Sequence, residues 1–228
     1  MTIHKPKVLF FDVNETLLDL TVMKQQIGAA LGGKEELLSL WFTTLLQYSL
    51  VLSASGQYKP FGQIGAAALQ MVAANNGITL SEDKAREIVI NAMQNLPPHP
   101  EVKQALTLLK KEGYTLVALT NSSEESLKNN FENIGLTPYF DQLLSIETVG
   151  KFKPFTDVYN WAANKMQVQP KDCMLIAAHG WDVAGAMWAG WRAAFVGRPG
   201  QQPFPLAPET EINETDLQKI AGILIIYR

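Results

Sequence analysis

Short apolar segments alternate with stretches of helical periodicity over much of the chain. The compact apolar runs predict buried strands, and the segments between them place apolar residues at helical spacing. Strands are expected at 8–11, at 114–120, within 140–150, at 173–178 and at 191–197. Strands that alternate with helices favour parallel βαβ units with right-handed crossovers, and hence an α/β fold. The C-terminal run 221–228 is expected to form a final strand or a buried tail.

Residues 18–96 have a different pattern, with four helical segments and no obvious strand. The rigid sequence PPHP at 97–100 closes this block and returns the chain to the sheet. We therefore predict two domains, a discontinuous core of residues 1–17 and 97–228 and an inserted helical cap of residues 18–96.

The composition is that of an ordinary globular protein. The 228 residues are 47% hydrophobic and 18% charged, with a formal net charge of −3. No basic stripe suggests nucleic-acid binding, and no apolar run approaches the ~20 residues of a membrane span. The single cysteine, Cys173, lies in an apolar run and is expected to be a buried packing residue. We expect a cytoplasmic protein with no nucleic-acid or membrane partner.

Polar side chains follow the predicted strands at the points where the strands end. They are, in chain order, Asp12, Thr120, Asn121, Lys153, His179 and Asp182. The carboxyl ends of parallel strands meet at one edge of a sheet, so these side chains are expected to converge. A carboxylate at the end of a buried strand is costly unless it is paired or used, so Asp12 either caps the next element or belongs to a site.

Four short motifs in chain order resemble those of the haloacid dehalogenase superfamily, and most closely those of the L-2-haloacid dehalogenases. The motifs are FDVNETLLD from residue 11, LTNSS from residue 119, Lys153-Pro154 with Tyr159, and WDVAGA from residue 181. The resemblance implies a Rossmann-like core with helices on both faces of the sheet and a helical cap. It also implies a homodimer that hydrolyses short L-2-haloacids to 2-hydroxy acids without a metal or an organic cofactor.

The resemblance assigns roles to the strand-end residues. Asp12 is the nucleophile that displaces halide and forms an ester, which water then hydrolyses. Lys153 keeps Asp12 ionised and balances the negative charge of the substrate. Thr120 and Asn121 bind the substrate carboxylate or the departing halide, and their alternative role is to cap the next helix.

Three residues are expected to support the site. Thr16 forms a hydrogen bond within the first loop, and Tyr159 belongs to the third motif. Asp182 positions Lys153 or the fourth loop, unless it is only an aspartate at the start of a helix.

Most of the superfamily transfers phosphoryl groups, but two positions argue against that chemistry. Asn14 stands where the phosphatases have a second aspartate, and an amide has no proton to give. Ala178 stands where they have an acidic Mg²⁺ ligand, and alanine cannot bind a hard cation. The sequence thus favours displacement at carbon over a phosphatase, while a catalytically silent binding protein is the other alternative.

Three positions also depart from the dehalogenase pattern. That family commonly has Tyr at Asn14, which we assign to substrate binding, Gly at Glu15, and Arg at Phe42. Loss of the guanidinium removes an always-charged anion donor. The halide is therefore expected to rely on Asn121 or on the aromatic edges of Phe42 and Trp181, with Phe42 lining the pocket.

His179 stands where the family commonly has asparagine. An imidazole with a pKa of roughly 6.5 is suited to take a proton from the water that cleaves the ester. Glu15 could accept the other ring N–H and fix the tautomer. We therefore expect a His179–Glu15 pair that activates water, and the alternative is a loop histidine satisfied by backbone. His4 and His99 are given no role.

Overall fold

The computed structural model describes residues 4–34 and 36–227, and its core is a parallel sheet in the strand order β3-β2-β1-β4-β5-β6. The strands are β1 (Val8–Phe11), β2 (Thr115–Thr120), β3 (Gln142–Ser145), β4 (Cys173–Ala177), β5 (Arg192–Val196) and β6 (Ile212–Glu214). Each neighbouring pair is parallel. The predicted α/β fold with a parallel sheet is confirmed.

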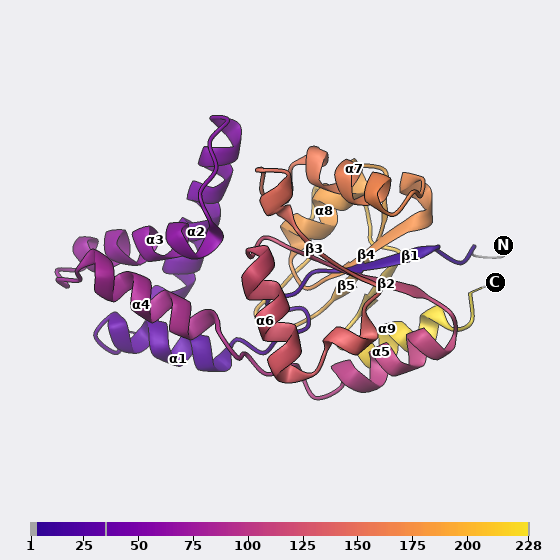
Figure 1. Ribbon diagram of the computed structural model, residues 1–228, viewed down its shortest axis with the longest axis horizontal. Helices are drawn as coiled ribbons and strands as arrows, with labels where there is room; N and C mark the ends of the chain where they lie inside the picture. Colours follow the sequence, from indigo (N-terminus) through magenta and orange to yellow (C-terminus); the bar gives the residue numbers. More distant parts are fainter. Residues whose placement is uncertain (1–3, 35, 228) are drawn as a thin grey trace.

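Helices cover both faces of this sheet, with α7 and α8 on one face and α5 and α9 on the other (Figure 1). The core helices are α5 (Val102–Lys111), α6 (Glu124–Ile134), α7 (Thr156–Lys165), α8 (Gly180–Trp188) and α9 (Leu217–Leu224). Single 3₁₀ turns lie at Thr137–Tyr139, Ile146–Thr148 and Pro170–Asp172.

The prediction of a final strand in the C-terminal run is wrong. The first part of that run completes α9, which buries Leu217, Ile220 and Leu224 at helical spacing. A short apolar run does not distinguish a buried strand from a buried helix segment. The alternative of a buried tail fits this inner face of α9, whereas Ile226 beyond it is exposed.

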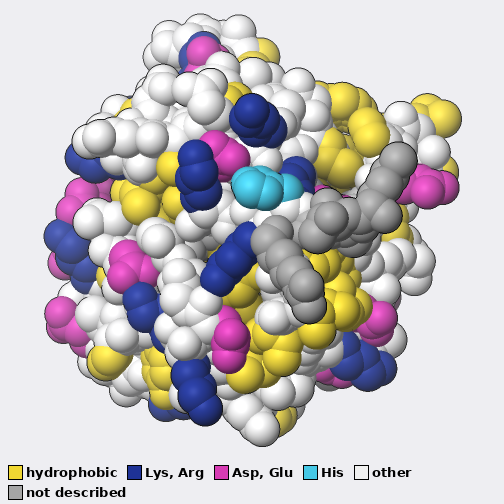
Figure 2. Space-filling model, turned by 90° about the vertical axis from the view of Figure 1, so that its right-hand side faces the viewer, with side chains coloured by type: hydrophobic (Ala, Val, Ile, Leu, Met, Phe, Trp, Pro, Cys, Tyr) yellow, Lys and Arg dark blue, Asp and Glu magenta, His cyan; other side chains and the backbone are white. Residues whose placement is uncertain are grey.

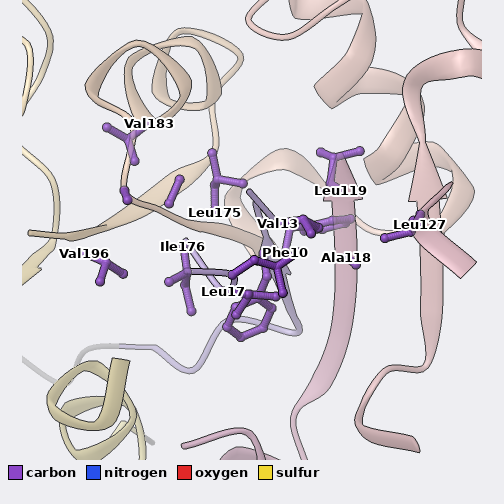
Figure 3. Packing of buried hydrophobic residues seen from close by; sticks show 14 of the residues in the cluster. Phe10, Val13, Leu17, Ala118, Leu119, Leu127, Leu175, Ile176, Val183 and Val196 are labelled. Atoms are coloured by element: carbon purple, nitrogen blue, oxygen red, sulfur yellow. The ribbon is translucent and has the colours of Figure 1, made fainter. Parts of the chain in front are cut away.

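The core explains why β1 is apolar without alternation. Phe10 and Leu17 lie among Leu175 and Ile176 of β4 and the side chains of β2 (Figure 3). A strand covered on both faces has no solvent side, so every position is apolar. Asp12 is thus the first polar group at the carboxyl end of a fully apolar, buried strand.

Four helices form the inserted cap between β1 and α5 (Figure 1). They are α1 (Thr21–Ala30), α2 (Leu37–Ala54), α3 (Phe61–Asn75) and α4 (Glu82–Met93). They pack on one another, and Trp41 of α2 is fully buried, with its Nε1 donating to Gly65 O at 2.9 Å. The chain leaves and re-enters the core side by side, because Leu18 forms an antiparallel bridge with Pro98.

Helix α2 differs from the other cap helices in its exposure. Like α3 it carries no charged residue, but it exposes more large hydrophobic side chains, among them Leu40, Leu50 and Val51. Among the helices in the described ranges, α2 alone is long and apolar enough, by length and composition, to cross a membrane. Core helices of soluble proteins pass the same test, so length and composition do not decide its environment.

The end of the molecule that faces away from the cap carries charges of both signs (Figure 2). Lys7 pairs with Asp172 at 2.9 Å, and Arg192 pairs with Glu211. Acidic partners interrupt the basic side chains there, so this face presents no continuous basic stripe.

Candidate active site

Asp12 lies at the carboxyl end of β1, and both of its carboxylate oxygens are bound. Lys153 Nζ donates to Oδ1 at 2.8 Å, and Thr16 Oγ1 donates to Oδ2 at 2.8 Å. His179 Nδ1 lies 3.1 Å from the same Oδ2. Burial opposes ionisation, but the charges and hydrogen bonds of Lys153 and His179 outweigh it and hold the pKa of Asp12 well below its ordinary value. Asp12 is therefore a carboxylate at neutral pH.

The Lys153 ammonium links Asp12 to a second buried carboxylate. Its Nζ donates to Asp182 Oδ2 at 2.5 Å and to Leu119 O at 3.0 Å. Tyr159 OH donates to Asp182 Oδ1 at 2.6 Å. Burial disfavours the charge on Lys153, but Asp12 and Asp182 raise its pKa, so the ammonium persists. Burial also raises the pKa of Asp182, and the ammonium opposes that rise.

His179 is held by two carboxylates, one at each ring nitrogen. In addition to the contact with Asp12, Nε2 lies 3.0 Å from Glu15 Oε2. Ionised carboxylates only accept hydrogen bonds, so this geometry suits a ring that is protonated at both nitrogens. Burial disfavours the cation, but the bonds to Asp12 and Glu15 raise the pKa of His179 to about 9. The structure thus brings the predicted His179–Glu15 pair together and adds a contact with Asp12 that the sequence did not indicate.

Two aromatic rings lie against His179 at the boundary of cap and core. Phe42 of α2 stacks at a centroid distance of 6.0 Å and Trp181 of α8 at 5.2 Å, each at an interplanar angle of 24°. All three rings line a cavity of about 320 Å³ between cap and core. Its walls also include Glu15, Leu20, Met23, Lys24, Leu38, Leu46 and Gln201. His179 contacts both this cavity and Asp12, so the cavity approaches the nucleophile on the histidine side.

The substrate ligands predicted in the first two motifs do not line this cavity, and each forms a hydrogen bond within the protein. Thr120 Oγ1 accepts from Ser122 N at 3.1 Å, and Asn121 Oδ1 accepts from Lys153 N at 3.0 Å. Asn14 Nδ2 donates to Ser122 Oγ at 3.4 Å. The residue that caps α6 is Ser123. In this structure Thr120 shapes the turn after β2, and Asn121 holds the backbone that carries Lys153.

Thr16 and Ala178 connect the first loop to the loop after β4. Thr16 Oγ1, which donates to Asp12, accepts from Ala178 N at 2.9 Å. No group of three or more His, Cys, Asp or Glu side chains suited to a metal ion occurs within residues 4–34 and 36–227. The space between Asp12 and Asp182 is filled by the Lys153 ammonium.

Four residues that contact the first loop were missed by the sequence analysis. Gln201 Nε2 donates to Glu15 Oε2 at 2.8 Å, and Lys24 Nζ lies 3.5 Å from Glu15 Oε1. His99 Nε2 lies 2.9 Å from Glu15 O, and Arg198 donates to Thr16 O at 2.8 Å. One signal was available: a non-glycine residue at a position where relatives have glycine indicates a strained backbone that needs support, and the φ of Glu15 is +64°.

Known proteins resemble this chain over most of its length. The family model described as haloacid dehalogenase-like hydrolase matches residues 6–190. (S)-2-haloacid dehalogenase H-109 of Pseudomonas putida is 31% identical over 193 residues, covering 84% of this chain and 86% of that protein. (S)-2-haloacid dehalogenase 1 of Pseudomonas sp. (strain CBS-3) is 29% identical over 201 residues, covering 87% and 88%.

Solved structures show the same fold. L-2-haloacid dehalogenase from Xanthobacter autotrophicus matches with a TM-score of 0.88 at 23% identity, over 96% of this chain and 98% of that chain. A second structure of that enzyme, with chloropropionic acid covalently bound, has the same TM-score at 22% identity and the same coverage.

Proposed function

Because this chain belongs to the haloacid dehalogenase superfamily, and within it to the L-2-haloacid dehalogenase family, we propose that it hydrolyses short L-2-haloacids to 2-hydroxy acids through an ester on Asp12. The observation that carries the proposal is the state of Asp12, a buried carboxylate kept ionised by Lys153. The relatives that share about 30% of the sequence carry the same activity in their names. Asn14 and Ala178, at the two positions that phosphatases use for acid and metal, support attack at carbon.

The first step is a displacement at C2 of the substrate. An oxygen of Asp12 forms a bond to C2, and the carbon–halogen bond breaks with its electron pair leaving on the halide. This leaves a neutral ester at Asp12 and inverts C2. Lys153 keeps Asp182 as its counter-ion when the charge on Asp12 disappears. The halide departs against the aromatic edges of Phe42 and Trp181, which line the cavity.

The second step uses His179, whose charge depends on the first. In the free protein His179 is a cation and cannot accept a proton. Esterification removes the negative charge at Nδ1, so Glu15 becomes its only carboxylate partner and the pKa of His179 falls. The ring then releases one proton to solvent. The neutral imidazole takes a proton from the water that attacks the ester carbonyl carbon, and the bond between that carbon and the substrate oxygen breaks. The proton of the new Asp12 carboxyl group passes to the departing oxygen, so the hydroxy acid leaves and the Asp12 carboxylate and the imidazolium are regenerated.

Halide release from both enantiomers of 2-chloro- and 2-bromopropionate, with and without a chelator, tests the activity. We expect release from the L enantiomers, unchanged by chelator and abolished in Asp12→Asn. A single turnover in heavy-oxygen water with excess protein should place the label first in the peptide that contains Asp12. Label found only in the hydroxy acid would refute the ester, and Mg²⁺-dependent release of phosphate from a generic ester would favour a phosphatase.

We also propose that the protein is a homodimer in which the exposed face of α2 packs against a second copy. This face is uncharged and exposes Leu40, Leu50 and Val51, so a second identical face matches it better than charged surface does. Light scattering should give twice the chain mass, and Leu50→Glu with Val51→Glu should give one chain mass. A native protein that stays monomeric, or that binds lipid vesicles through α2, would overturn the dimer.

A further inference from the structure

The carboxylate of Glu15 receives side chains from three separate parts of the chain. His179, from the loop after β4, and Gln201, from the loop after β5, both bind Oε2, at 3.0 and 2.8 Å. Lys24, from α1 of the cap, lies 3.5 Å from Oε1. Glu15 is itself buried. Core and cap thus meet at the group that holds the outer nitrogen of His179.

The backbone of Glu15 is fixed separately from its side chain. Its φ of +64° lies in the left-handed region. His99 binds Glu15 O, and Arg198 binds Thr16 O. These contacts hold the main chain of the loop, but they leave the direction and charge of the carboxylate to Gln201 and Lys24.

The segment that carries Gln201 also packs closely against the chain next to His179. Gly180 directly follows His179, and a Cβ at that position would collide with Gln202 O and Phe204 N. The close approach therefore requires glycine. The loop that begins at Arg198 consequently contacts the first loop on one side and the start of α8 on the other, so Gln201 is held in register with both Glu15 and His179.

The charged groups around this pair come from every element packed on it. Asp12, which directly follows β1, faces Nδ1 of His179, and Lys153 binds the other oxygen of Asp12. Lys24 of α1 faces Glu15, while His99 and Arg198 face only the backbone of the loop. Donors on Glu15 reduce the negative charge that it presents to His179. Each donor therefore weakens the hold of Glu15 on the His179 proton.

We propose that Gln201 and Lys24 are positioning residues that act through Glu15 on His179 and so control the hydrolysis of the Asp12 ester. The inference rests on the proposed function and deepens it. Gln201 is the stronger of the two, because its contact is shorter and Lys24 is partly exposed to screening solvent.

The experiment compares Gln201→Met with Gln202→Met, and Lys24→Met with Lys84→Met. Gln202 is the exposed neighbour of Gln201. Lys84 is an exposed cap lysine in an ion pair with Glu87, and it does not line the cavity. For each variant we would measure the halide burst, the hydrolysis rate as a function of pH, the KM, and the titration of the His179 ring by NMR in the free protein.

Without one of its donors, Glu15 should hold the His179 proton more tightly and raise the pKa of that ring. Because hydrolysis requires a neutral ring, the pH midpoint of hydrolysis should shift upward. A shift of about one pH unit in Gln201→Met slows hydrolysis about tenfold at a pH below the midpoint. The shift in Lys24→Met should be smaller. At saturating substrate the halide burst should slow far less than hydrolysis, and the His179 ring should titrate at higher pH. All properties of the two controls should stay unchanged.

Two results would overturn the inference. One is a burst that slows in proportion to hydrolysis, which indicates a general loss of packing. The other is an unchanged titration of His179. If the unmodified protein released no halide, the proposed function would fail, whereas the NMR titration would still decide whether Gln201 and Lys24 act on His179.

Discussion

The two sides of Asp12 differ in what surrounds them. On one side Lys153, Asp182 and Tyr159 are fully buried, and Asp182 forms hydrogen bonds with both of the others. On the other side His179 and Glu15 border a cavity of about 320 Å³. A charge sealed from water keeps its state, whereas a group beside a cavity can exchange protons with solvent. The buried side therefore provides constant charge for the first step, and the cavity side provides a group whose charge can change between steps.

Removing the cation of the buried side should have the largest effect. Lys153→Met leaves two buried carboxylates without their common partner, which should cost about 3–5 kcal/mol of unfolding free energy and abolish halide release. Lys151→Met is the matched control, because that lysine forms an exposed pair with Asp157 and should change stability by less than about 0.5 kcal/mol. Urea unfolding and halide assays check both. Equal urea midpoints for Lys153→Met and Lys151→Met would contradict the special role of the buried cation beside Asp12.

Changing the cavity side should separate the two chemical steps. His179→Asn keeps Lys153 and Thr16 on Asp12, so one equivalent of halide should still be released. Hydrolysis of the ester should slow by about 10²–10⁴ for loss of a general base. Mass spectrometry should then detect the substrate-derived group on the protein. A variant that turns over at the parent rate at every pH would show that His179 has no such role.

The cavity side should also govern stability in alkali. His179 has a pKa raised to about 9 from an ordinary 6.5, so its protonated form stabilises the fold fully below pH 6.5. That stabilisation is lost as the pH rises through 9, and it amounts to roughly 3 kcal/mol. Urea unfolding between pH 6 and 10 should show this decline in the parent protein and a flat profile in His179→Asn. A parallel decline in both proteins would assign it to another group.

The smallest effect concerns the backbone of the first loop. An L-residue in the left-handed region costs about 1–2 kcal/mol, and glycine does not incur that cost. Glu15→Gly should therefore be more stable than Glu15→Ala by about 1 kcal/mol, while both slow hydrolysis. At Asn129, an exposed position inside α6, the order should be reversed, because alanine is the better helix former by about 1 kcal/mol. Calorimetry measures both pairs, and the same order at both sites would contradict the role of the φ of Glu15.

The fold could be predicted because its signals are local. Buried parallel strands are short apolar runs, and the cap shows as a block of helical periodicity without strands. The prediction for the C-terminal run was wrong for the same reason, since a local signal of apolar residues suits a strand as well as the inner face of α9. Cys173, expected to be buried packing, is buried in β4.

The site could be predicted only as far as strand ends determine it. Asp12, Lys153, His179 and Asp182 converge because each follows a parallel strand. Gln201 and Lys24 reach Glu15 from a late loop and from the cap, and no spacing in the sequence relates those segments. The contact between His179 and Asp12 likewise depends on how two loops fold, since a histidine at a strand end can point in several directions. Thr120 lies at its predicted strand end, yet its hydroxyl is used by the adjacent turn.

The bridge between Leu18 and Pro98 brings together the two chain crossings between core and cap, so the cap is an insert whose ends already meet. The free-energy cost of closing a loop rises only slowly with its length. An insert of another size can therefore occupy the same junction without distorting the sheet. Phe42 and Lys24 belong to this insert, whereas Asp12 and Lys153 belong to the core. Exchange of the insert during evolution can therefore change the walls of the pocket without changing the reacting groups.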